Sequence, residues 1–126
     1  MSFEWAAYLE LAENLAGTPE DDPCLEAKLR SAISRAYYAA FCTARNHIRD
    51  VEGESVPQSP RIHEFVSAHF KVESDHSHRD VGVNLDRLRL IRNRADYDDD
   101  LDGLKAMAQK ALHRAQHVIN RLEGLP

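Results

Sequence analysis

The sequence contains little of what marks several large classes of protein. It has only two cysteines, Cys24 and Cys42, and neither belongs to a CxxC pair, so the sequence indicates neither a disulfide framework nor a thiolate metal site. The five glycines stand singly, which excludes a glycine-rich phosphate loop, and neither GxSxG nor HExxH occurs. The net charge of -5 argues against a general nucleic-acid-binding protein, because such proteins are usually basic overall.

Long hydrophobic runs are also missing. No apolar stretch approaches the ~20 residues that a membrane-spanning helix needs. The first residues, MSFEWAAYLELAENL, carry acids and lack the basic start of a signal peptide. Cysteines without a pairing pattern suit a reducing compartment. We therefore expect a cytoplasmic protein without a membrane partner, and the 43% hydrophobic and 29% charged residues are ordinary for a globular domain.

The spacing of apolar residues is helical throughout, because no segment alternates apolar and polar residues as a half-buried strand does. The run Ala36–Cys42 is apolar on every side, which indicates the central helix of a bundle. Short connections favour antiparallel neighbours. The sequence therefore predicts an all-α, antiparallel up-and-down bundle of four main helices plus a short one. The expected helices cover residues 3–16, 24–50, 61–70, 84–96 and 101–123.

Capping chemistry gives further expectations at the helix ends. Ser2 is a candidate N-cap of the first helix. The polar segment 71–80 is expected to be a loop. Asp98–Asp100 lack the spacing of an EF-hand, so we expect them to complement the dipole at the start of the last helix rather than bind a cation.

Seven histidines raise the question of a metal site. His76 and His78 form an HxH beside Asp75, a set that could hold zinc, but no further motif completes it and solvated loop histidines are favoured. His113 and His117 are four residues apart on the exposed side of the last helix, where a chance surface pair is favoured.

The remaining histidine pair lies in the short helix. His63 and His69 are six residues apart and do not stack on one face. We therefore expect no metal and no cofactor.

One arginine occupies a position that should be apolar. At about 100° per residue, the apolar residues of Leu85–Ala95 form one stripe, and Arg92 falls inside it, with Arg89 and Asp96 just beside it. Burying an unpaired guanidinium costs several kcal/mol or more. Arg92 is therefore either paired internally, with Asp96 or an acid of another helix, or it lines a wet cleft that binds an anion.

Polar side chains continue toward the end of the same helix. Asn93, Tyr97 and Asp98 follow Arg92, and such a grouping could hold a phosphodiester through bidentate arginine contacts. The aromatic residues at 37, 38 and 41 are most simply core. A buried tyrosine hydroxyl still needs a partner, and one of these hydroxyls facing the Arg92 cleft is the open alternative.

Three segments carry a family resemblance: LRSAISRAYYAAFCTARNHI (29–48), RIHEFVSAHF (61–70) and LDRLRLIRNRADYD (85–98). In this order and spacing they resemble the HEPN family, and most closely its small stand-alone prokaryotic members, which are often encoded beside a minimal nucleotidyltransferase. The resemblance spans about residues 25–123 and implies a single HEPN-like domain over residues 1–126. It also implies a homodimer in which the fourth helix of each subunit flanks a shared cleft.

The resemblance further implies a type of active site. Active HEPN ribonucleases carry an arginine, usually a polar residue after it, and a histidine after four to six further residues; they cleave RNA without metal through the 2′-hydroxyl. Arg92 and Asn93 match the start of that motif, but Tyr97 stands where the histidine is expected. A tyrosine, with a pKa near 10, exchanges protons poorly at neutral pH. In related toxin–antitoxin pairs the transferase adds AMP to a nearby tyrosine, which makes Tyr97 the modification candidate.

The resemblance therefore predicts a HEPN toxin-like protein that binds RNA or a nucleotide in a dimer cleft. The expected binding residues are Tyr37, Arg89, Arg92, Asn93 and Arg94, and the expected catalytic residues are Arg92, Asn93 and Tyr97. A divergent metal-independent ribonuclease of a toxin–antitoxin or defence system is one alternative. A non-catalytic module that partners a nucleotidyltransferase is another, and a plain helical dimer with structural arginines is a third.

Overall fold

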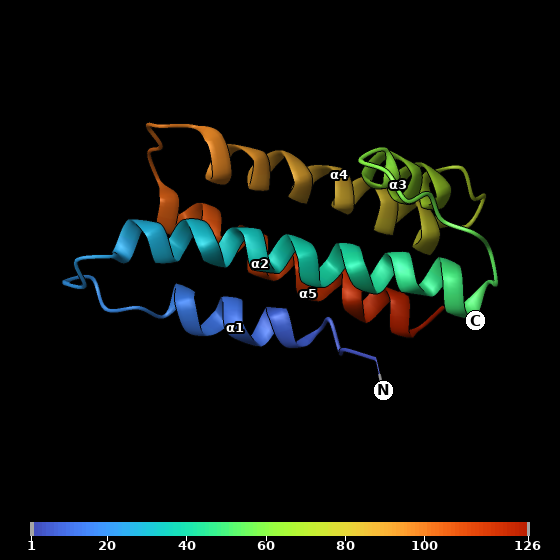
Figure 1. Ribbon diagram of the computed structural model, residues 1–126, viewed down its shortest axis with the longest axis horizontal. Helices are drawn as coiled ribbons and strands as arrows, with labels where there is room; N and C mark the ends of the chain where they lie inside the picture. Colours follow the sequence, from blue (N-terminus) through green and yellow to red (C-terminus); the bar gives the residue numbers. More distant parts are fainter. Residues whose placement is uncertain (1, 126) are drawn as a thin grey trace.

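The computed structural model describes residues 2–125, and every regular element in that range is helical. The elements are α1 (Ala7–Ala16), α2 (Leu25–Asn46), the π-helical turn η1 (His47–Val51), α3 (Ile62–Lys71), α4 (His76–Tyr97) and α5 (Leu104–Glu123). Helices α1, α2, α4 and α5 run alternately up and down, with α3 beside the start of α4 (Figure 1). The expected all-α antiparallel bundle is confirmed. No helix within residues 2–125 is long and apolar enough to cross a membrane.

Helix α2 is the central element, as the apolar run in its sequence predicts. It packs against α1, α4 and α5. Small residues make this possible, because Ala36, Ala39, Ala40 and Ala44 are fully buried and let the neighbouring backbones approach closely. Helix α5 buries a single stripe that ends at Leu122 and leaves its other face to solvent, again as expected.

The start of α1 differs from the expectation. The helix begins at Ala7, its N-cap position is Ala6, and Ser2 does not cap it. Three aromatic rings instead pack edge to edge before and within its first turn. Their centroids are 4.9 Å apart for Phe3 and Trp5 and 5.5 Å apart for Trp5 and Tyr8. This aromatic cluster occupies the segment before Ala7, where the sequence predicts the first turn of the helix.

Helix α4 begins at His76, well before the expected start at residue 84. The predicted loop over residues 71–80 is therefore correct only for residues 72–75, because residue 71 ends α3 and residues 76–80 belong to α4. Asp75 caps the helix by accepting a hydrogen bond of 3.2 Å from the His78 backbone N–H. Val81 is then the first fully buried residue of the helix. The cap and this contact with the core stabilise two polar turns whose own apolar spacing is weak.

The acidic residues at 98–100 are also placed differently. Helix α5 begins at Leu104 and has no acid in its first turn, so Asp98–Asp100 lie in the connection before it. The backbone of this connection is held by Arg30 of α2. Its guanidinium donates to the carbonyl oxygens of Ala95 at 2.9 Å, Asp98 at 2.6 Å and Asp99 at 3.2 Å. A cation thus satisfies free carbonyls at the C-terminal end of α4.

Helix α2 does not continue to residue 50 in α-helical form. It changes into the π-helical turn η1, where the Glu52 N–H donates to the His47 carbonyl oxygen at 3.1 Å. A π turn sets residues five apart onto the same side of the helix. The apolar spacing of the sequence does not reveal this change.

Candidate functional site

Arg92 is buried in the stripe where the sequence places it, with 8% of its surface exposed. Its guanidinium donates from Nη1 to Asp96 Oδ2 at 3.3 Å. It also lies over two aromatic rings of α2, 5.2 Å from the Tyr37 centroid and 5.4 Å from that of Tyr38. The internal pairing with Asp96 is therefore present, but it is a single long hydrogen bond.

Two guanidinium donors near this place have no protein partner. The Nε atoms of Arg89 and Arg92 are both buried and make no hydrogen bond within the described part of the chain. Almost all buried donors in proteins are paired, so two unpaired N–H groups on neighbouring turns of one helix are unusual. Arg89 and Arg92 are three positions apart in the sequence, which puts both side chains on one face of α4. Such a pair of cations can bind an anion.

A tyrosine and a histidine lie beside these arginines. The Tyr37 hydroxyl is 2.5 Å from His63 Nδ1, and the His63 ring stacks on Phe41 with centroids 4.4 Å apart. Burial raises the pKa of Tyr37 well above its usual value, although Arg89 and Arg92 oppose the shift. Burial, and then the same two arginines, lower the pKa of His63. The pair is therefore neutral at pH 7, and a hydrogen bond joins the Tyr37 hydroxyl and His63 Nδ1.

His63 is the residue that sequence reasoning missed. Within its own helix it stands six residues from His69 and shows no motif. The contacts that define it come from α2 through Tyr37 and Phe41, and from the electrostatic influence of Arg89 and Arg92 on α4. Its position inside the segment RIHEFVSAHF, one of the three carrying the family resemblance, was the available signal.

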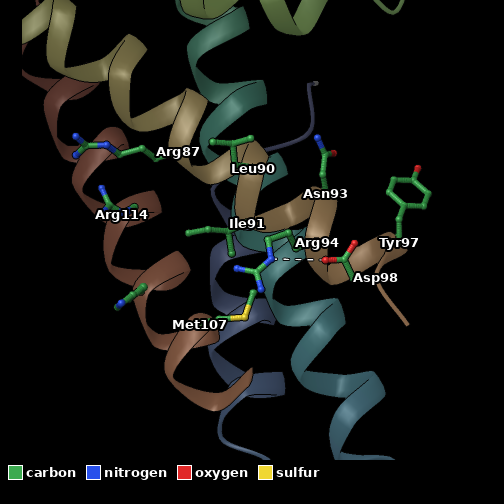
Figure 2. A pocket seen from close by; sticks show the side chains of 10 residues that line it. Arg87, Leu90, Ile91, Asn93, Arg94, Tyr97, Asp98, Met107 and Arg114 are labelled. Carbon is green, nitrogen blue, oxygen red and sulfur yellow. Dashed lines mark ion pairs between the residues drawn. The ribbon is translucent and has the colours of Figure 1, made fainter. Parts of the chain in front are cut away.

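The other expected site residues lie toward the outside of α4. Arg94 forms an ion pair with Asp98, at 3.6 Å between Nε and Oδ2, on the side that faces α5 (Figure 2). Asn93 and Tyr97 point away from α5, and Tyr97 is 75% exposed (Figure 2). Within one chain, therefore, Tyr37, Arg89 and Arg92 come together, and Asn93 shares a small pocket with Arg89. Arg94 and Tyr97 are separate from these arginines and line a groove on the other side of Asn93.

A groove runs between α4 and α5, with a volume of about 870 Å³. Four cations line it, while Ile91 and Met107 supply apolar floor (Figure 2). The cations are Arg87, Arg94, Lys110 and Arg114. This concentration of positive charge stands out in a chain whose net charge is -5. Polyanions are attracted to such local patches regardless of overall charge.

Comparison with models of protein families shows that residues 23–125 match the family described as HEPN domain. The chain belongs to the HEPN family. An uncharacterized protein of Methanocaldococcus jannaschii is 31% identical over 90 residues, covering 60% of this chain and 51% of that relative. The chain thus spans about half the length of the curated relative it matches. No solved structure matches the chain.

In this HEPN bundle the place of the motif histidine is taken by Tyr97, which stands apart from Arg92 on the solvent side of α4. The imidazole near Arg92 is that of His63, from a different helix. Its Nδ1 is engaged by the Tyr37 hydroxyl, which leaves Nε2 as the ring nitrogen free to contact a ligand.

The other histidine motifs do not form sites. His76 and His78 lie on the first turn of α4 rather than in a loop, and His78 Nδ1 contacts Asp75 Oδ2 at 2.7 Å. His117 pairs with Asp80 of α4 instead of joining His113, which is exposed. Neither His76 with His78 nor His113 with His117 therefore directs two imidazoles toward one ligand.

Proposed function

We propose that this HEPN protein binds a phosphate group of RNA or of a nucleotide in a cleft between two copies of the chain. The observation that carries the proposal is the pair of buried, unpaired Nε donors of Arg89 and Arg92. Planar guanidinium groups bind phosphate oxygens through two parallel hydrogen bonds. The neutral Tyr37–His63 pair adds no competing negative charge.

The dimer is supported by the outer face of α4. Leu90 is 65% exposed beside the outward-pointing Asn93 and Tyr97. Large exposed apolar side chains grouped with aromatic ones are typical of surfaces that associate. A twofold axis at this face would set the α4 helices of two subunits against each other, with both copies of Asn93 and Arg94 near a shared cleft.

Binding is better supported than cleavage. Metal-independent cleavage needs a group that takes the proton of the 2′-hydroxyl, and Tyr37 already engages His63 through Nδ1. Tyr97 exchanges protons poorly near neutral pH. We therefore propose an RNA-binding, toxin-like HEPN protein. If the protein is also found to cleave RNA, the proposal extends to ribonuclease activity.

The experiment incubates labelled total RNA in EDTA with the wild-type protein, the Arg89→Ala variant or the Arg92→Ala variant, and measures RNA binding and cleavage for each protein. We expect the wild type to bind RNA without cutting it, and each variant to bind at least about tenfold more weakly, with a smaller salt dependence. Arg49→Ala removes the same charge from an exposed ion pair with Asp50 and serves as the control.

Two results would contradict the proposal. One is unchanged binding in both arginine variants. The other is a large loss of thermal stability in Arg92→Ala with unchanged binding, which would mark Arg92 as a structural partner of Asp96. Cleavage by the wild type alone would instead show that the cleft is catalytic without its motif histidine.

The exposure of Tyr97 favours a second candidate function, that of a non-catalytic module paired with a nucleotidyltransferase. Its hydroxyl is open to a transferase that adds AMP, whereas Tyr37 is buried. If a folded wild-type dimer fails to bind RNA, this role gains support. Co-expression with a minimal nucleotidyltransferase should then add the mass of AMP, and Tyr97→Phe should abolish the addition.

A further inference from the structure

Four side chains of metal-ligand type meet where η1 joins α3. Glu52, Glu54 and His69 each offer one ligand atom, and these atoms all lie within 4.8 Å of one another. His69 Nε2 is 2.8 Å from Glu52 Oε1, and His69 Nδ1 is 3.4 Å from Glu54 Oε2. The fourth side chain is His47, whose Nε2 is 3.5 Å from Glu52 Oε2. Glu52 thus stands between two imidazoles.

His47 is the independent sign that this cluster is more than surface acids. Only 7% of the residue is exposed, and its buried Nε2 has no hydrogen-bond partner within residues 2–125. The ring contacts Phe70 on its apolar side, with centroids 5.9 Å apart, and turns Nε2 toward Glu52. A buried nitrogen without a partner is costly, whereas a metal ion would use its lone pair directly.

Local backbone features create this arrangement. In a regular α-helix, residues five apart point about 140° away from each other, so His47 and Glu52 would not meet. The π turn of η1 brings them onto one side, and such turns are frequent at functional sites. Gly53 then takes a positive φ of 71°, which reverses the chain between the two glutamates.

We propose that His47, Glu52, Glu54 and His69 bind one divalent transition-metal ion, with Zn²⁺ as the best match. Two imidazoles and carboxylates select zinc-like ions over Mg²⁺ and Ca²⁺, which prefer oxygen ligands alone. With metal–ligand bonds of about 2.1 Å, neighbouring ligand atoms of a tetrahedral site lie about 3.4 Å apart. One ligand atom each from Glu52, Glu54 and His69 already lie within 4.8 Å of one another, and His47 Nε2 lies 3.5 Å from Glu52, so small side-chain rotations would bring one atom of each residue to that spacing.

The role that follows is structural. The four ligands come from η1, from the segment after it and from α3, so one ion would fasten the connection between α2 and α3. Helix α3 also carries His63, about 9 Å along the helix axis from His69 at 1.5 Å per residue. The ion would therefore hold the helix that supplies the Tyr37 contact. The site itself is separate from Arg89 and Arg92 and does not depend on the proposed function.

The test titrates Zn²⁺, and Co²⁺ as a visible probe, into tag-free full-length protein that has been stripped with EDTA. We expect one ion per chain by calorimetry, a d–d absorption band from Co²⁺, and a higher melting temperature with Zn²⁺. Glu52→Gln and His69→Gln should each lower the affinity by at least about 10- to 100-fold, the range known for losing supporting residues alone.

Matched controls separate the site from general metal binding. Glu73→Gln and His113→Gln change the same side-chain types at exposed positions outside the cluster and should bind like the wild type. Circular dichroism verifies that each variant is folded, and Glu52→Gln is the most conservative because that side chain is at the surface. A wild type that binds neither ion, or a folded Glu52→Gln variant with wild-type affinity, overturns the proposal in favour of a simple His69–glutamate ion pair.

Discussion

Arg92 shows how one charged residue is accommodated in an apolar stripe. Its flat face lies over the rings of Tyr37 and Tyr38, and a desolvated contact of this kind contributes roughly 2 kcal/mol. Its edge makes one long hydrogen bond to Asp96. These contacts offset only part of a burial cost of several kcal/mol. The remaining donor capacity, shared with Arg89, is the chemical basis for the anion binding that we propose.

His63 gives a prediction at the same scale. Its pKa is lowered by burial and then by Arg89 and Arg92, so the folded protein favours the neutral ring. The unfolded chain takes up the proton near pH 6.5. Stability contributed by the neutral ring is therefore present above about pH 6.5 and is lost as the pH falls below it. We expect the free energy of unfolding to decrease on acidification, and less steeply in His63→Gln.

Urea unfolding at a series of pH values measures this difference. His113→Gln is the control, because His113 is exposed and should leave the wild-type slope unchanged. His47 also has a lowered pKa, chiefly through burial, but it contributes equally in all three proteins. Identical slopes for wild type and His63→Gln would show that His63 does not hold a lowered pKa.

At the scale of elements, the contact between α3 and α4 depends on one glycine. A Cβ at Gly82 would lie 2.6 Å from the Ser67 carbonyl oxygen and 2.9 Å from the Lys71 backbone nitrogen. Backbone atoms cannot move aside without shifting the helix. Gly82 therefore lets α4 pack close to α3, which in turn holds His63 and His69 in place.

We expect Gly82→Ala to destabilise the protein by about 1–3 kcal/mol, the usual cost of overpacking. Alanine gains about 1 kcal/mol in intrinsic helix propensity, so a net loss can come only from the clash. Chemical denaturation measures the change. Gly124→Ala is the matched control, because its Cβ would meet the nearest atom at an ordinary 3.6 Å. A Gly82→Ala variant as stable as the control would contradict this packing.

At the scale of the whole molecule, the bundle covers α2 on several sides but leaves the outer side of α4 open (Figure 1). That side carries Leu90 and Tyr97, two of the most exposed large hydrophobic side chains of the described residues. In the dimer proposed above, this open face of α4 would lie against α4 of a second subunit. The proposed phosphate-binding cleft would then be complete only in the dimer.

We expect Leu90→Lys to convert a dimer into a monomer, because it places two like charges and no apolar contact at the interface. Sedimentation velocity reports the change, and circular dichroism should show unchanged helix content. Val72→Lys alters an 80% exposed valine between α3 and α4 and should leave the dimer intact. A Leu90→Lys protein that sediments like the wild type would place the interface elsewhere.

The sequence by itself determined the features that depend on local periodicity. Helical spacing predicted the order of the helices, the central position of α2 and the position of Arg92 within the apolar stripe of α4, because side chains three and four residues apart share a face whatever surrounds them. The three motif segments identified the family, which the match over residues 23–125 confirms. Helix ends were less reliable: Ser2 and Asp98–Asp100 were assigned the wrong local role, and α4 was expected to begin too late.

Only the tertiary structure decided which distant side chains meet. His63 reaches Tyr37 across 26 residues of sequence, and His69 reaches Glu52 across 17, because α3 folds back over the end of α2. The early start of α4 and the π turn of η1 also depend on packing around Phe70 and Val81, which no local spacing encodes. Helical periodicity is a property of neighbouring residues, whereas a site is a convergence of segments that only the packed core brings together.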